Sequence, residues 1–308
     1  EIEALGEFHV PHNKLARMQS SELAFLPDRE GDVVRDGVRV HYYEFGPADP
    51  NAATVVYVHG FNIASPEFVL QVNVLRPRGV RQVLVDLRGH GRSARCVPEQ
   101  LDIDAAADDI AAVLAARKVR GPVVVVGHSL GGPVSLSLMR RHAGEFAWAG
   151  SVQVSSAVEP FTMQGMPRLL AGPAGSALGW VVRHTPHFAE GLRRAITEGL
   201  VPVLAVGFYF RPVPWEVIRF HADMIKQTQL PTYEGFFDDL QEHSETGAAS
   251  VLAGIPGYIL VGERDRVTPV SQSRRLWDIW PRAWLQILPE SGHMPPLDAP
   301  GAVTAAIE

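Results

Sequence analysis

The sequence predicts an α/β protein with a mostly parallel, doubly wound sheet and an inserted helical cap. Short runs of β-branched residues recur without polar alternation, which is typical of parallel strands covered on both faces. Helix-like stretches separate these runs, and this order favours right-handed crossovers with helices on both faces of one sheet. The rhythm is interrupted between residues 157 and 247, where we expect the insertion.

The strands are expected at seven segments. The first alternates polar and apolar residues with period two, which predicts an edge or antiparallel strand. The next four are β-branched runs without alternation, and the pattern resumes late in the chain with two more. In order, the segments are 38–45, 54–60, 81–87, 122–128, 150–156, 258–262 and 283–288.

Helix-like stretches follow several of these strands. In the first of them, Asp104 lies near the start and Arg117 near the end, and charges in these places suit the helix dipole. The expected helices are 103–118, 129–144, 271–280 and the closing stretch 298–308.

The interruption divides the chain into three parts. The segment 157–247 is rich in proline and aromatic residues, and it is too long and too apolar for a loop. We expect it to form a helical cap over the carboxyl ends of the strands. Residues 1–156 are then the first part of the core, and 248–308 are the second part, which carries the acid and the histidine discussed below.

Composition and charge exclude several classes of protein. With 308 residues, 46% of them apolar and 20% charged, the chain can bury a core without disulfides or a structural metal. A formal net charge of −6 argues against a nucleic-acid surface, and the most apolar stretch, 201–210, is too short to span a membrane.

The single cysteine, Cys96, favours a reducing compartment, so we expect a cytoplasmic protein. The printed chain does not begin with methionine, so export or envelope association stays open. Nothing in the sequence indicates the oligomeric state.

A serine in a tight turn is the strongest chemical signal. Residues 127–131, Gly-His-Ser-Leu-Gly, follow a run of four valines and open a predicted helix. The glycines are needed because side chains would not fit beside the serine in so sharp a strand-turn-helix turn. This context predicts that Ser129 is a nucleophile, with the dipole of the following helix directed at the site.

A nucleophilic serine requires a base and an orienting acid. Of the histidines that follow Ser129, His293 alone lies after a late strand in a turn-rich loop, and it is the expected base. Asp265 follows the preceding late strand and is the expected acid. Glu263 is its local rival, and Asp298 is a weaker one because we expect it to cap the last helix.

Together these motifs resemble those of the single-cap α/β-hydrolases, in the group of serine esterases and non-haem haloperoxidase-like proteins. The resemblance spans about 38–308 and rests on 58–61 (Val-His-Gly-Phe), 86–93 (Asp-Leu-Arg-Gly-His-Gly-Arg-Ser), the serine turn, Asp265 and His293. It implies the α/β-hydrolase fold and an oxyanion hole formed by the backbone amides of Phe61 and Leu130. It also implies that the insertion covers the active site.

No cofactor and no metal are expected. His59 and His90 lie in turns and are expected to orient loops, and the pair His184 and His187 lacks a carboxylate partner at zinc-site spacing. Some side chains could line a substrate pocket, although a cap core or turn role competes for most of them: Asn62, His128, Phe208, Phe210, Trp215 and Met294.

The expected function is hydrolysis of a carboxylic ester, or a related acyl bond, in a small to medium and largely apolar substrate. Serine at position 129 argues against epoxide hydrolase and haloalkane dehalogenase chemistry, which this fold carries out with an aspartate. A carbon–carbon bond hydrolase, thioesterase, amidase or perhydrolase would use the same triad. A ligand receptor of the same fold with little turnover is the alternative from another class.

Overall fold

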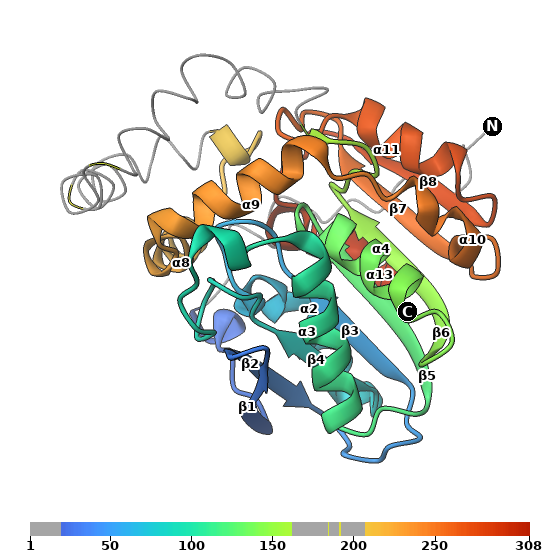
Figure 1. Ribbon diagram of the computed structural model, residues 1–308. Coiled ribbons are helices and arrows are strands. Elements are labelled where there is room, and N and C mark those ends of the chain that lie inside the picture. The colour runs from blue at the N-terminus through green and yellow to red at the C-terminus, as the bar shows by residue number, and fades with distance from the viewer. Residues whose placement is uncertain (1–19, 162–183, 185–190, 192–206) are drawn as a thin grey trace.

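The computed structural model describes residues 20–161, 184, 191 and 207–308. They form one eight-stranded sheet in the order β1-β2-β4-β3-β5-β6-β7-β8 (Figure 1). The strands from β3 to β8 are parallel to one another, whereas β2 is antiparallel to both β1 and β4. The strands are β1 (Arg29–Arg35), β2 (Val38–Phe45), β3 (Thr54–Val58), β4 (Arg81–Val85), β5 (Pro122–His128), β6 (Ala147–Val154), β7 (Gly257–Gly262) and β8 (Ala283–Leu288).

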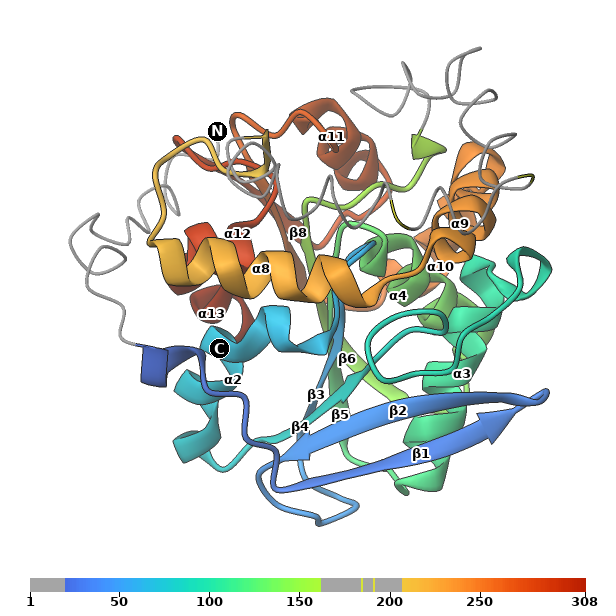
Figure 2. The ribbon, with the colours of Figure 1, turned by 90° about the vertical axis from the view of Figure 1, so that its left-hand side faces the viewer.

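Helices cover both faces of this sheet. Figure 2 shows α2 and α13 on one side of the strands and α3 and α4 on the other. The longer helices are α2 (Val69–Leu75), α3 (Ile103–Ala116), α4 (Gly131–Arg141), α8 (Trp215–Gln227), α9 (Leu230–Glu242), α11 (Val270–Asp278) and α13 (Pro300–Ile307). Short turns of helix are η1 (Ser20–Leu23), η2 (Ser65–Phe68), η3 (Arg76–Arg78), η4 (Pro98–Gln100), η6 (Thr246–Ala248), α10 (Ala249–Leu252) and α12 (Pro295–Asp298).

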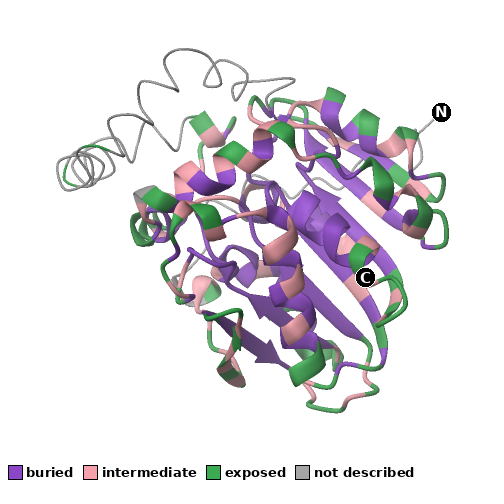
Figure 3. Cartoon of the chain, in the orientation of Figure 1, coloured by how far each residue is buried: buried purple, intermediate pink, exposed green. Residues whose placement is uncertain are grey.

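The valine run explains the central position of β5. It pairs in parallel with β3 on one side and β6 on the other, and Val123, Val125 and Val126 are fully buried. β-branched side chains suit such a strand because they pack well on both faces of a covered sheet. Figure 3 shows the central strands as buried and the outer surfaces of the helices as partly or fully exposed.

The predicted mostly parallel, helix-covered sheet is confirmed, and all seven predicted strands are present. The strand at 38–45 is antiparallel, as its alternation predicts. Strand β1 was not predicted from the sequence. Its residues, REGDVVR, alternate between intermediate and exposed positions, because this edge strand has one paired neighbour and no fully buried face.

Two helices of the expected cap are described, α8 and α9, and both lie between β6 and β7 in the chain. Figure 2 shows α8 crossing the end of the sheet. Its buried Val217 and Met224 pack with Ile63, which follows β3, and with Met294, which lies near the end of the chain. Residues 162–183, 185–190 and 192–206 of the expected cap lie outside the described residues, so its boundaries stay predictions.

Within the described residues, no helix is both long enough and apolar enough to cross a membrane.

Candidate active site

Ser129 lies at the sharp turn between β5 and α4. Its φ of 53° is in the left-handed region, which non-glycine residues rarely adopt. A Cβ added at Gly131 would lie 2.0 Å from the carbonyl oxygen of Val58, so helix α4 can start this close to β3 only because the residue is glycine. The Ser129 amide donates to the carbonyl oxygen of Val154 at 3.0 Å, which ties the turn to β6.

The three residues predicted as nucleophile, base and acid form one hydrogen-bonded chain. His293 Nε2 lies 3.0 Å from Ser129 Oγ, and His293 Nδ1 lies 2.9 Å from Asp265 Oδ2. All three residues are buried, each with about 5% of its surface exposed. In this arrangement the imidazole can accept the hydroxyl proton while the carboxylate holds the opposite ring nitrogen protonated.

The loop after β7 holds the predicted acid, Asp265, in place. Asp265 Oδ1 accepts the amides of Val267 and Thr268, both at 2.9 Å, and Oδ2 lies 3.0 Å from the Thr268 hydroxyl oxygen. Burial alone would raise the pKa of Asp265, but the charge and hydrogen bond of His293, the Thr268 amide and the Ser155 side chain bring it below its ordinary value. Asp265 is therefore held as a carboxylate. Its local rival, Glu263, is exposed.

Thr268 is a site residue that the sequence analysis missed. Its hydroxyl donates to the carbonyl oxygen of Ser155, beyond β6, at 2.8 Å and also reaches Asp265. A threonine three residues after a candidate acid is a weak signal, because its partner 113 positions away becomes visible only in the fold.

The expected role of Asp298 was wrong. This residue precedes α13, whose N-cap is Ala299 without a side-chain hydrogen bond. Asp298 instead accepts the Ser291 hydroxyl at 2.6 Å and the Gly292 amide at 3.0 Å. It therefore shapes the loop that carries His293 rather than capping the last helix.

The loop after β3 lies opposite the serine turn. Asn62 has a φ of 64°, and its amide donates to His90 Nε2 at 3.1 Å, so His90 orients this loop as expected. Within the described part of the chain, the Phe61 and Leu130 amides donate to no protein acceptor. An oxyanion hole requires backbone amides that no protein acceptor occupies, and the oxyanion role of these two amides stays a prediction.

Similarity to known proteins agrees with this geometry. The family model of the alpha/beta hydrolase family matches residues 55–307. The chain belongs to the alpha/beta hydrolase family. The AB hydrolase superfamily protein YisY of Bacillus subtilis is 37% identical over 251 residues, covering 78% of this chain and 84% of that protein.

A non-heme haloperoxidase of Rhodococcus erythropolis is 28% identical to this α/β hydrolase over 245 residues, covering 77% of this chain and 82% of that protein. The solved structure of a thermophilic esterase from Thermogutta terrifontis superposes with a TM-score of 0.68 at 23% identity, covering 91% of this chain and 96% of that one. These similarities confirm the resemblance to the esterase and haloperoxidase-like group.

The residues predicted to line a pocket in this α/β hydrolase have different surroundings. Phe208 is partly buried, with its ring centroid 6.0 Å from that of His293, and Met294 is buried beneath α8. Phe210 is 49% exposed, and the Arg264 guanidinium lies over its ring. Trp215 is 48% exposed at the start of α8.

Asn62 is partly buried, with its side-chain oxygen buried and unbonded within the described structure. The expectation for His128 needs correction. This residue is fully buried and hydrogen-bonded through both ring nitrogens, so it lies in the interior and not at a pocket wall.

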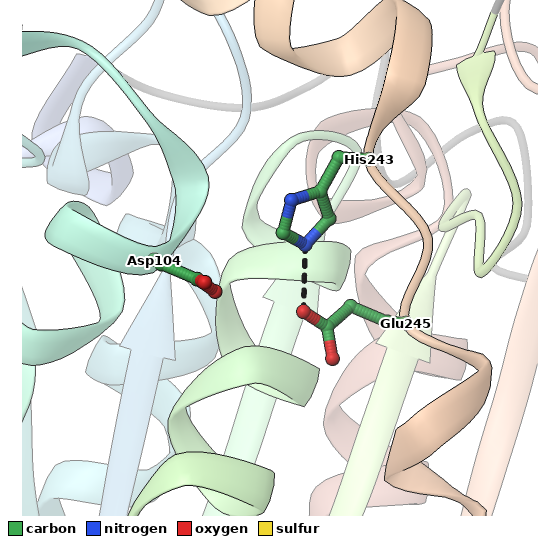
Figure 4. Close-up of side chains that lie close together, drawn as sticks. All are labelled: Asp104, His243 and Glu245. Carbon is green, nitrogen blue, oxygen red and sulfur yellow. Dashed lines mark hydrogen bonds and ion pairs between the residues drawn. The ribbon is translucent and has the colours of Figure 1, made fainter.

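A second polar cluster of the hydrolase lies where the chain leaves α9. Figure 4 shows Asp104, His243 and Glu245 with their polar atoms facing one another. His243 Nε2 lies 2.6 Å from Glu245 Oε1, and Arg140 reaches Glu245 at 2.8 Å and Asp104 at 3.4 Å. Because Arg140 pairs with both carboxylates and Arg141 also pairs with Asp104 at 3.3 Å, the cluster is an ion-pair network that ties the end of α9 to α3 and α4. His187, of the disfavoured zinc pair, lies outside the described residues.

A buried neutral histidine makes the stability of the hydrolase depend on pH. His221 on α8 accepts the Tyr209 hydroxyl at Nδ1, 3.0 Å away. Burial, and then electrostatic interactions with His128 and His293, lower the pKa of His221 to about 3. The unfolded chain, with an ordinary histidine pKa of about 6.5, therefore binds more protons than the folded chain between these values, so stability falls as the pH falls.

We expect His221 alone to cost about 2 kcal/mol of unfolding free energy between pH 7 and pH 5. Denaturant unfolding of His221→Gln should show that much less acid destabilisation than the unmutated protein. His243→Gln is the matched control, because Glu245 raises the pKa of His243 against the effect of burial. In this control, the unfolding free energy should fall more steeply as the pH falls. Equal slopes of unfolding free energy against pH in all three proteins would contradict the assignment.

Proposed function

We propose that this α/β hydrolase cleaves carboxylic esters through an acyl-enzyme on Ser129. One observation carries the proposal: the chain from Ser129 Oγ to His293 Nε2 at 3.0 Å and from His293 Nδ1 to Asp265 Oδ2 at 2.9 Å. The amides of Phe61 and Leu130 support it, because an oxyanion hole needs backbone donors that no protein acceptor within the described residues already occupies.

The reaction would proceed in two halves. Ser129 Oγ attacks the ester carbonyl carbon as His293 Nε2 takes the hydroxyl proton, and His293 then protonates the departing alkoxide. Water, deprotonated by His293, attacks the acyl-enzyme and releases the acid together with free Ser129. Asp265 stabilises the imidazolium in both halves, and each oxyanion donor contributes about 3 kcal/mol.

The substrate we propose is small to medium and largely apolar. Support comes from the Phe208 ring beside His293 and from the apolar cluster of Ile63, Val217 and Met294 next to the base loop. Thioester, amide or carbon–carbon bond cleavage and perhydrolysis would use the same residues. A receptor with little turnover would differ in showing covalent labelling without ester turnover.

Replacement of the nucleophile tests the proposal directly. Ser129→Ala should abolish labelling by a fluorophosphonate and lower turnover of p-nitrophenyl esters by several orders of magnitude, with an unchanged circular dichroism spectrum. The reason is that alanine has no hydroxyl to attack the ester or the phosphonate. Near-normal turnover by the folded variant would contradict the nucleophile assignment.

The two carboxylates of the loop after β7 provide a matched pair. Asp265→Asn should lower kcat about 10⁴-fold, because an amide cannot hold His293 in the required tautomer. Glu263→Gln, in the same loop but exposed, should leave kcat unchanged. Steady-state kinetics of both variants decide the assignment, which fails if the two behave alike.

A chain-length series tests the apolar substrate. If the acyl chain is buried, kcat/KM should rise over the first several carbons by up to about 0.8 kcal/mol per methylene, which is about fourfold. Phe208→Asn should flatten this slope while fluorophosphonate labelling persists. Phe210→Asn is the control, because its ring packs on Arg264 and is half exposed. A flat series in the unmutated protein would point to a small or polar substrate.

A further inference from the structure

A buried carboxylate and a buried imidazole meet between the loops that carry the active site. Glu67 lies in η2, after β3, and His128 is the last residue of β5; both are fully buried. Glu67 Oε2 lies 2.8 Å from His128 Nδ1. The reaction proposed above does not use either side chain.

The contacts of this pair extend to each catalytic loop. Glu67 Oε1 accepts the amide of Gly60, which immediately precedes Phe61, at 2.8 Å. His128 Nε2 donates to the carbonyl oxygen of His293 at 2.8 Å. The backbone of His128 continues directly into Ser129, so one side-chain pair contacts the oxyanion loop, the serine turn and the base loop.

The acceptors around the ring decide where its protons lie. A backbone carbonyl only accepts, so Nε2 of His128 must carry a hydrogen. The Gly60 amide is the donor to Oε1 of Glu67, which leaves Oε2 to face Nδ1. With an ionised Glu67, Nδ1 is the donor and both ring nitrogens are protonated. Burial lowers the pKa of His128, but Glu67, together with the His293 carbonyl and the charge of Asp265, raises it above its ordinary value, which agrees with an imidazolium.

There is little room for this arrangement to shift. A Cβ added at Gly60 would lie 3.0 Å from His128 Nδ1 and 3.2 Å from the Cβ of Ser129. The ring of His128 also lies against that of His293, with centroids 5.3 Å apart. A displacement of Glu67 or His128 would therefore move the Phe61 amide or His293, and a displacement of about 1 Å can cost about 10²-fold in rate.

We propose that Glu67 and His128 are positioning residues, a carboxylate–imidazolium pair that sets the oxyanion loop and the base loop relative to Ser129. This inference rests on the proposed ester hydrolysis for its kinetic consequences. The proton placement does not depend on it.

Three substitutions of Glu67 separate positioning from simple loss of a side chain. Glu67→Gln can still accept from Gly60 and can donate to a neutral His128, so kcat should fall no more than about tenfold. Glu67→Leu removes both hydrogen bonds, and kcat should fall about 100-fold with little change in KM. Glu67→Asp keeps the charge but cannot reach both partners, so its kcat should lie between those of the Gln and Leu variants.

Glu263→Gln is the control for each variant, because it changes an exposed carboxylate outside the site. Circular dichroism and thermal melting establish which variants fold. Should Glu67→Leu fail to fold, the comparison of Glu67→Asp with Glu67→Gln decides the case. The proposal is overturned if the folded Leu or Asp variant keeps the unmutated kcat.

Nuclear magnetic resonance of ¹⁵N-histidine-labelled protein at pH 7.5 provides a readout independent of activity. We expect two protonated ring nitrogens on His128 in the unmutated protein and one, Nε2, in Glu67→Gln. A single ring proton in the unmutated protein would overturn the pairing. Absence of fluorophosphonate labelling in that protein would instead overturn the proposed function, while the proton count would still decide the pairing.

Discussion

The left-handed backbone at Ser129 is the constraint on which the rest of the site depends. A non-glycine residue with a φ of 53° costs about 1–3 kcal/mol and persists only where its surroundings impose it. Here they do so through β5, which is buried between β3 and β6, and through Gly131, which lets α4 start against the carbonyl oxygen of Val58. The serine hydroxyl is thereby held clear of the backbone, next to His293.

Other unusual backbone conformations gather at the same edge of the sheet. Among the described residues, six other than glycine have a positive φ, and four of these lie in loops that follow parallel strands at the site: Asn62, Ser129, Ser155 and Glu290. Neighbouring loops hold them by polar contacts, as His90 does at Asn62 and Thr268 at Ser155. The loops at the carboxyl ends of the parallel strands therefore hold one another in place around the reacting groups.

The buried histidines of this protein differ in charge because their hydrogen-bonding partners differ. Burial lowers the pKa of His59 and of His90, and each accepts a backbone amide at Nε2. Among the described residues, neither ring is hydrogen-bonded to a carboxylate. His128 is just as buried, and burial lowers its pKa too, but Glu67, the His293 carbonyl and Asp265 together raise it overall. The charge of a buried histidine therefore follows from the acceptors around it.

The sequence by itself determined the elements whose signals are local. Valine runs predict covered strands, and glycines around Ser129 predict its turn, because each encodes a conformation within a few residues. The order of Ser129, Asp265 and His293 could be predicted from the strands that precede them. Only the tertiary structure decided that Glu67 meets His128, 61 residues away, and that β1 pairs as an edge. Which partner a buried polar group meets depends on elements that come together only when the chain has folded. Whether that group carries a proton follows from this partner.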